Sequence, residues 1–181
     1  MQYLKKALKS PTTGEEDTRR IVQDMLADIE AGGEQKVRDY AKKLDKWTGD
    51  IIVSAETIEA AGASLSQRAR DDIQFAYERV EKFAQAQLES MKEFETELSP
   101  GLVAGQRLIP VGTAGCYIPG GRYAHIASAV MSVTTAKVAG VKHVVACSPT
   151  RGDQGVHPSI LYTAHLAGAD TILALGGVQG I

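Results

Sequence analysis

Residues 114–121 of the chain read AGCYIPGG, and residues 171–179 read TILALGGVQ. In each stretch an apolar, strand-like segment runs directly into a pair of glycines, and a helix-forming segment follows. Glycine allows a ligand to approach the backbone closely, and the free N–H groups at the start of a helix attract an anion such as a pyrophosphate. Because open α/β sheets bind ligands at turns of this kind, the two stretches predict an α/β fold with a ligand site.

Each glycine turn also carries a hydrogen-bonding side chain, Tyr117 at the first and Gln179 at the second. The strict G-x-G-x-x-G fingerprint of dinucleotide sites is absent, so one such turn alone favours a tight strand-to-helix connection without a ligand. The occurrence of two turns shifts the interpretation towards binding. The candidate cofactor-binding residues are Tyr117, Gln179, Gly120, Gly121, Gly176 and Gly177.

Strands and helices alternate after Pro100. The order strand, helix, strand, helix, strand predicts a parallel sheet, in which right-handed crossovers bring both glycine turns to the same edge. Gly140 and Gly168 are placed as stop signals after the two helices. The expected strands are 108–111, 114–118, 144–148 and 171–175, and the expected helices are 126–139 and 158–167.

Helical patterns dominate before Pro100. Two capping boxes, Thr13 with Glu16 and Ser64 with Gln67, predict two helix starts. The expected helices are 13–32, 34–46, 55–63 and 64–94. The predicted fold is therefore α/β, with an N-terminal helical region at 1–100 followed by an incomplete Rossmann-like parallel βαβ sheet at 101–181.

The composition indicates a globular protein with a small-molecule ligand. Of 181 residues, 20 are basic and 22 acidic, which gives a net charge of -2 and no basic footprint for nucleic acid or an anionic membrane. No apolar run approaches the ~20 residues of a membrane span, and no signal-peptide core follows the N-terminus. We expect a cytoplasmic protein without nucleic-acid or membrane partners.

Three residues of types that often carry function are interpreted as structural. Cys116 and Cys147 fall inside predicted buried strands, where a free thiol behaves as a small apolar residue, so no disulfide is expected. Trp47 follows a predicted helix and is expected to fill a gap between helices.

The histidines show no metal-binding pattern, because His157 and His165 lack the i, i+4 spacing of paired ligands. His125 differs from them. It follows the first glycine pair, where Arg122 and a helix start are in position to hold an anion with it. The alternative is a solvated loop histidine. Arg122 and His125 are the candidate substrate residues, and no metal ligand is identified.

Several of these segments resemble the histidinol dehydrogenase family. The similarity extends over essentially the whole chain and includes 111–121 (VGTAGCYIPGG), 146–149 (ACSP) and 175–179 (LGGVQ). In that family NAD oxidises a zinc-bound alcohol in two successive hydride transfers, alcohol to aldehyde to carboxylate, within an α/β homodimer. The resemblance implies NAD and zinc as cofactors, and it implies cofactor contacts by Tyr117 and Gln179.

Within that family, residues 122–132 (RYAHIASAVMS) look like the sulfopropanediol 3-dehydrogenases, which oxidise 2,3-dihydroxypropane-1-sulfonate to sulfolactate. A sulfonate is a permanent anion, so a loop with Arg122 and His125 suits it better than it suits the cationic histidinol. The sulfonate is therefore the expected substrate. Histidinol is the alternative.

The family's zinc ligands and acid/base pair are expected downstream of Ile181, so this segment is expected to contain no catalytic residue and to be inactive alone. An exposed sheet edge next to the last strand is expected for the same reason, with poor solubility or association. Two other classes stay open. One is a non-catalytic nucleotide-binding module, and the other is an interaction domain that uses the 64–94 helix.

Overall fold

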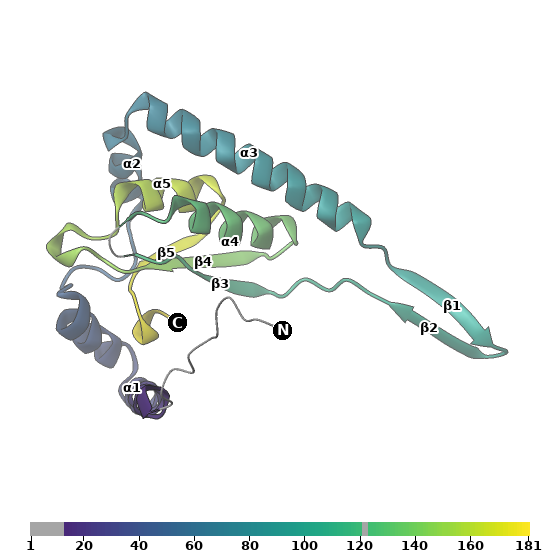
Figure 1. The fold of residues 1–181 in the computed structure, drawn as a ribbon, viewed down its shortest axis with the longest axis horizontal. Helices are drawn as coiled ribbons and strands as arrows, with labels where there is room; N and C mark the ends of the chain where they lie inside the picture. Colours follow the sequence, from purple (N-terminus) through teal and green to yellow (C-terminus); the bar gives the residue numbers. More distant parts are fainter. Residues whose placement is uncertain (1–12, 121–122) are drawn as a thin grey trace, which may run out of the picture.

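A computed structural model gives the fold of residues 13–120 and 123–181 (Figure 1). Three parallel strands form its central sheet, in the order β3-β4-β5. Each strand is joined to the next by a helix, as the alternating pattern predicts. The elements are β3 (Thr113–Tyr117), α4 (Ile126–Val138), β4 (His143–Ser148), α5 (Pro158–Leu166) and β5 (Thr171–Ala174). The predicted α/β class and its parallel sheet are confirmed.

Glycines end both crossover helices. Gly140 has φ +86° and follows the C-cap residue of α4. Gly168 has φ +98° and follows the C-cap residue of α5. This left-handed conformation is strained for residues with a β-carbon, so glycine stops the helix and turns the chain back towards the sheet. The predicted stop signals are confirmed.

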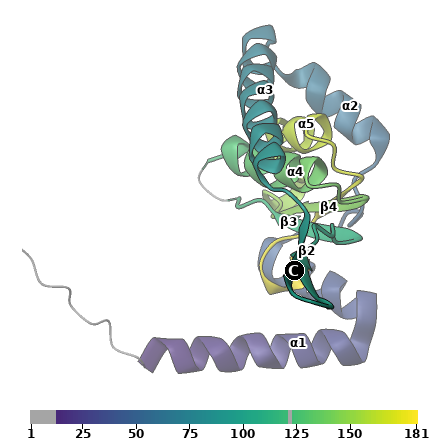
Figure 2. The ribbon, with the colours of Figure 1, turned by 90° about the vertical axis from the view of Figure 1, so that its right-hand side faces the viewer.

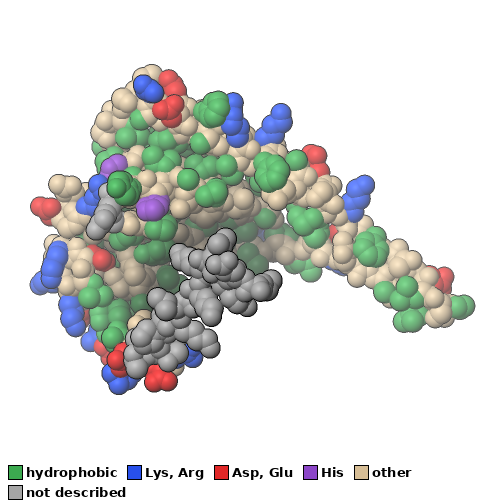
Figure 3. Space-filling view, in the orientation of Figure 1, with side chains coloured by type: hydrophobic (Ala, Val, Ile, Leu, Met, Phe, Trp, Pro, Cys, Tyr) green, Lys and Arg blue, Asp and Glu red, His purple; other side chains and the backbone are tan. Residues whose placement is uncertain are grey.

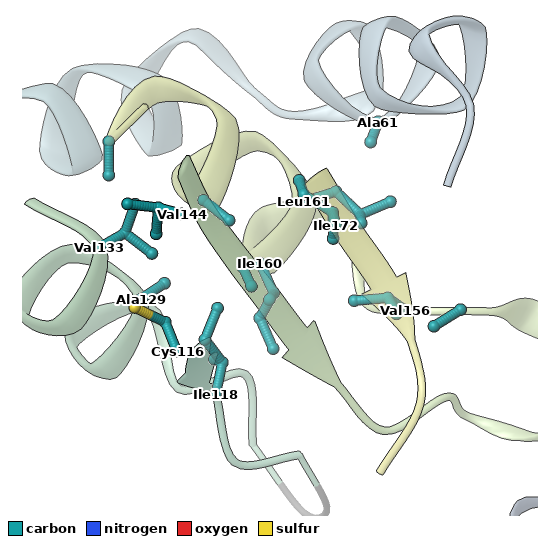
Figure 4. Close-up of a cluster of buried hydrophobic side chains, with 14 of the residues drawn as sticks. Ala61, Cys116, Ile118, Ala129, Val133, Val144, Val156, Ile160, Leu161 and Ile172 are labelled. Atoms are coloured by element: carbon teal, nitrogen blue, oxygen red, sulfur yellow. The ribbon is translucent and has the colours of Figure 1, made fainter. Parts of the chain in front are cut away.

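The main core lies between the sheet and the crossover helices (Figure 4). Val144 of β4, Val133 of α4 and Ile160 of α5 are almost completely buried there. A second layer of helices, α2 (Ala55–Ser64) and α3 (Gln67–Ser90), covers α5 and α4 on the side away from the sheet (Figures 1 and 2).

The first helix, α1 (Thr13–Tyr40), lies on the opposite side of the sheet (Figure 2). At Gly33, φ +58° and ψ -149° interrupt it, so it consists of two helices that meet where the sequence predicts. A π-helical turn, η1 (Ala41–Asp45), continues it, and Lys46, the expected end of the helix, is its C-cap. The proposed Thr13 cap rests on a side chain outside the described residues.

A small second core joins η1 to the last strand. Ala41, Ile51 and Leu175 are its buried members, and Trp47 contacts both this cluster and the main core. The Trp47 indole N–H donates to the carbonyl oxygen of Asp50 (3.1 Å). Trp47 therefore fills a gap, as predicted, but the gap lies between the N-terminal helices and the sheet and not between two helices.

The Ser64–Gln67 capping box is wrong. Ser64 is the last residue of α2, and its hydroxyl donates to the Ala61 carbonyl oxygen (2.7 Å). Ser66 caps α3 instead, because its Oγ accepts from the backbone N–H of Ala69 (3.2 Å). Leu65, with ψ 144°, is extended and separates the two helices. The capping-box pattern did not predict this break.

A β-hairpin was not predicted. Strands β1 (Phe94–Ser99) and β2 (Leu102–Gln106) pair antiparallel around Pro100 and Gly101, and α3 ends at Ser90 rather than at residue 94. The expected strand 108–111 is wrong, because this segment is irregular. Pro110 has no N–H for a strand partner. The proposed division near residue 100 stays a prediction.

The hairpin extends away from the rest of the molecule (Figure 1), and every residue of its two strands is exposed. Its exposed apolar side chains give the green surface at the outer end of the space-filling view (Figure 3). They include Leu98, Leu102 and Val103. An isolated two-stranded hairpin of this kind is marginally stable in water.

The open edge of the parallel sheet is not where we expected it. The outer edge of β5 is covered, because Val53 N donates to Ile172 O (2.9 Å) and Ala174 N donates to Ile51 O (2.7 Å). Among the described residues, β3 pairs only with β4, and its Gly115 and Tyr117 are exposed. The N-terminal half supplies the neighbour of the last strand, which local patterns do not reveal.

The Asp170 carboxylate ties the start of β4 to the ends of α4 and α5. It accepts from Val144 N (2.7 Å) and from the Lys137 ammonium group (2.9 Å). The Val144 hydrogen bond and then the Lys137 contact lower the pKa of Asp170 below its ordinary value. A lowered folded-state pKa stabilises the fold above the unfolded-state pKa, and the stabilisation is lost as the pH falls through the folded-state value.

We predict that Asp170→Asn reduces the acid sensitivity of the fold. The unfolding free energy of the parent chain should begin to fall as the pH approaches the unfolded-state pKa of about 3.9, and it should keep falling through the lower folded-state pKa of Asp170. The variant should have a lower unfolding free energy than the parent at neutral pH. Its unfolding free energy should also decrease less as the pH is lowered. Urea unfolding across the pH series measures this. Asp153→Asn, at an exposed turn, is the control, and an unchanged slope for Asp170→Asn would contradict the prediction.

Candidate functional site

Both glycine turns lie at the carboxyl edge of the sheet, on either side of Pro149, which follows β4. A β-carbon on Gly120 would be 2.3 Å from Pro149 Cγ, and one on Gly176 would be 2.4 Å from Pro149 Cβ. Real side chains do not tolerate such distances. Glycine at these two positions is thus required by contact with the protein itself, and the two turns are neighbours across one proline.

Tyr117 links the two turns directly. Its hydroxyl oxygen accepts a hydrogen bond from the backbone N–H of Gly177 (3.3 Å), although the two residues are 60 positions apart. The side chain comes from the end of β3, and Tyr117 is 37% exposed. Gly177 has φ +57°, a conformation that favours glycine. The sequence prediction that places Tyr117 and the second turn at one edge is therefore confirmed in geometry.

Gln179 lies in a one-turn 3₁₀ helix, η3 (Val178–Gly180), and is almost completely buried. Its Nε2 donates to Asp45 Oδ2 (2.9 Å). Its Oε1 is buried and has no hydrogen-bond partner in the described part of the chain. A β-carbon on Gly177 would be 3.2 Å from this oxygen, so the unsatisfied acceptor adjoins the second glycine turn.

These features leave polar groups at this edge that a bound ligand is able to meet. A buried carbonyl oxygen without a donor is uncommon in native proteins and calls for an explanation such as a ligand. The Tyr117 hydroxyl supplies a second polar group at the same edge. The residues present are therefore compatible with an NAD site that uses Tyr117, Gln179 and the backbone of the second turn.

The first turn is described only in part, because Gly121 and Arg122 lie outside the described residues. Gly120 is placed against Pro149 as stated above. His125 occupies the cap position before α4, is exposed, and makes no capping hydrogen bond with its side chain. Its position at the helix start agrees with the prediction, whereas its role in binding an anion stays a prediction.

His157 and the two cysteines have structural roles in the fold. His157 Nδ1 accepts from the backbone N–H of Ser159 (3.2 Å) at the start of α5, and burial lowers the pKa of this histidine. Cys116 and Cys147 are free, as predicted, and burial raises the pKa of Cys147 to about 11. Neither thiol is suited to act as a nucleophile at neutral pH.

Within residues 13–120 and 123–181, no three His, Cys, Asp or Glu side chains are grouped as a metal ion would need. Across the same ranges, none of the helices is long and apolar enough to cross a membrane. A groove of about 490 Å³ adjoins Gln179 on the side of α1, and its lining includes Arg38, Glu34 and Leu173.

Two residues at this edge were not identified by sequence reasoning. Pro149 was noted only as part of a strand ending, and Asp45 only as part of a helical segment. Asp45 is 134 positions before its partner Gln179. No local spacing rule connects residues at such a separation, so only the folded chain reveals their contact.

The fold and this edge define an α/β protein of the kind that binds ligands beyond the carboxyl ends of parallel strands. A family model described as histidinol dehydrogenase matches residues 8–181. The chain belongs to the histidinol dehydrogenase family, a family of dehydrogenases, which confirms the resemblance seen in the sequence.

Individual relatives agree with this assignment. The chain is 62% identical over 180 residues to a histidinol dehydrogenase homolog of Pelagibacter ubique, covering 99% of this chain and 42% of the relative. It is 53% identical over 181 residues to a sulfopropanediol 3-dehydrogenase of Ruegeria pomeroyi, covering 100% of this chain and 42% of the relative. The chain thus spans about two fifths of the length of these curated relatives.

A solved structure confirms the fold. The crystal structure of histidinol dehydrogenase from Elizabethkingia anophelis aligns with a TM-score of 0.84 at 31% identity. The alignment covers 96% of this chain and 39% of that structure. The arrangement of helices and parallel sheet described above is therefore shared with an enzyme of this family.

We predict that Gly176→Ala destabilises the fold by about 1–3 kcal/mol, because the new β-carbon collides with Pro149, including its Cα at 2.9 Å. Gly115→Ala is the matched control, since a β-carbon at this strand position meets nothing within 4 Å. Urea unfolding of the two variants measures the difference. Equal stability of the two variants would show that the turn does not depend on close contact with Pro149.

Proposed function

We propose that the chain contributes the NAD site of an NAD- and zinc-dependent dehydrogenase, which oxidises a primary alcohol to a carboxylate in two hydride transfers. The observation that carries this proposal is the convergence of Tyr117, the second glycine turn and the unsatisfied Gln179 oxygen at one sheet edge. NAD supplies the hydride acceptor for both transfers, and water supplies the second oxygen of the carboxylate.

The chain's own residues are proposed to bind and orient the cofactor. Tyr117 and Gln179 contribute hydrogen-bonding groups, and Gly120, Gly121 and the second turn let the ligand approach the backbone. The zinc ligands and the acid/base pair are proposed to come from the part of the family's length that this chain does not span. The whole protein is proposed to act as a homodimer, as the resemblance implies.

For the substrate we propose 2,3-dihydroxypropane-1-sulfonate, with sulfolactate as product. The name of the Ruegeria pomeroyi relative supports this choice, and so does the charge of the Arg122 to His125 loop. Histidinol is the second candidate, because the solved relative from Elizabethkingia anophelis is a histidinol dehydrogenase. The relative at 62% identity is named only as a homolog and favours neither substrate.

Parallel assays separate these substrates. The full-length gene product, supplied with zinc and NAD, is offered the sulfonate and histidinol, and NADH absorbance is followed. We expect turnover of the sulfonate alone. Turnover of histidinol alone would contradict the substrate proposal and support the family's founding activity. If neither alcohol is oxidised but NAD raises the Tm without zinc, the protein is a binding module.

We predict that Arg122→Ala raises KM for the sulfonate about tenfold or more, because a hydrogen bond between two charged groups is lost. KM for an uncharged alcohol should change little. Arg107→Ala is the control, since Arg107 is an exposed arginine whose nearest acid is Glu95 at 3.9 Å. Steady-state kinetics give both constants, and an equal loss with every alcohol would argue against a sulfonate contact.

A further inference from the structure

Asp45 connects the N-terminal helices to the proposed cofactor site. It is the last residue of η1, and Trp47 N donates to Ala41 O (3.2 Å) across this turn. Ala41 is buried together with Leu175, which precedes the second glycine turn. The Asp45 carboxylate is thus carried on a packed segment, and its Oδ2 accepts from Gln179 Nε2 (2.9 Å).

This contact decides which way the Gln179 amide points. A carboxylate only accepts hydrogen bonds, whereas a glutamine side chain has a donor end and an acceptor end. Facing Asp45, the amide must present its NH₂ group. Its oxygen is then directed elsewhere, and it lies beside Gly177, where a β-carbon would be 3.2 Å away.

The orientation leaves Oε1 as an unused acceptor at the second glycine turn. This atom is shielded from solvent and has no donor in the described part of the chain. Because Gly177 has no side chain, no β-carbon occupies the position 3.2 Å from this oxygen. A ligand group that meets this oxygen must itself be a donor, such as a hydroxyl or an amide N–H.

The same geometry disfavours a phosphate at the second turn. The Gly177 N–H already donates to the Tyr117 hydroxyl (3.3 Å), so it is not free for an anion. The Asp45 carboxylate lies just behind Gln179 and repels negative charge. This refines the expectation from the sequence, in which both glycine turns were candidates for pyrophosphate.

We propose that Asp45 is a positioning residue that orients the Gln179 amide, so that Oε1 receives a hydroxyl or amide donor of the bound dinucleotide. This inference rests on the proposed function, because the ligand is the NAD proposed above. Asp45 itself does not touch the ligand. Its effect on binding therefore passes through Gln179.

The test measures NAD affinity by titration calorimetry on the full-length gene product, without alcohol substrate. Asp45→Ala should raise the dissociation constant roughly tenfold, the loss of affinity expected when a partly buried, charge-assisted hydrogen bond no longer orients a ligand contact. Asp45→Asn, which keeps an acceptor oxygen, should restore part of the affinity. If the alanine variant does not fold, the asparagine variant alone tests whether Asp45 affects NAD affinity.

The matched control is Asp39→Ala. Asp39 also accepts from a glutamine amide, Gln35 Nε2 at 3.2 Å, but on the exposed surface of α1. NAD affinity should be unchanged in this variant. A tenfold loss in Asp39→Ala as well would indicate a general effect on the N-terminal helices and would overturn the positioning role.

A double-mutant cycle with Gln179→Ala separates positioning from structural support. If Asp45 acts through Gln179, then Asp45→Ala should cause no further loss of NAD affinity once Gln179 is alanine. An undiminished tenfold loss in that background would overturn the proposal, as would wild-type affinity in Asp45→Ala alone. Failure of the parent protein to bind NAD would instead overturn the proposed function, and this inference with it.

Discussion

The two glycine turns lie against Pro149 without room for a β-carbon, and the geometry of the candidate site depends on this contact. The proline follows the middle strand, so it brings the ends of the two outer strands to its two sides. The Tyr117 hydroxyl can then reach the backbone N–H of Gly177. Two motifs that are far apart in the sequence thereby become one edge, which is what a ligand as large as a dinucleotide requires.

The N-terminal segment contacts this edge of the sheet directly. Residues 51–53 add backbone hydrogen bonds to the outer side of β5, and Trp47 packs against both buried clusters. Asp45 reaches Gln179 from the same segment. A change in the N-terminal half is therefore able to alter the second glycine turn.

Sequence reasoning succeeded where local chemistry is decisive and failed where tertiary contacts compete. Gly140 and Gly168 end their helices because a left-handed residue is needed there, and this signal is local. Ser64 and Ser66 are both acceptable caps by composition, and the extended Leu65 between them decides the outcome. The hairpin around Gly101 was missed because Pro100 was interpreted as a boundary and not as a turn.

The sequence by itself determined the α/β class and the parallel order of strands and helices, because periodicity and glycine placement are local properties. It also singled out Tyr117 and Gln179 as candidate binding residues. Only the tertiary structure decided that Pro149 separates the turns, that residues 51–53 cover β5, and that Asp45 accepts a hydrogen bond from Gln179. These contacts join residues as far as 134 positions apart. Hydrogen-bond direction and close packing depend on positions in space, so no spacing along the chain specifies them.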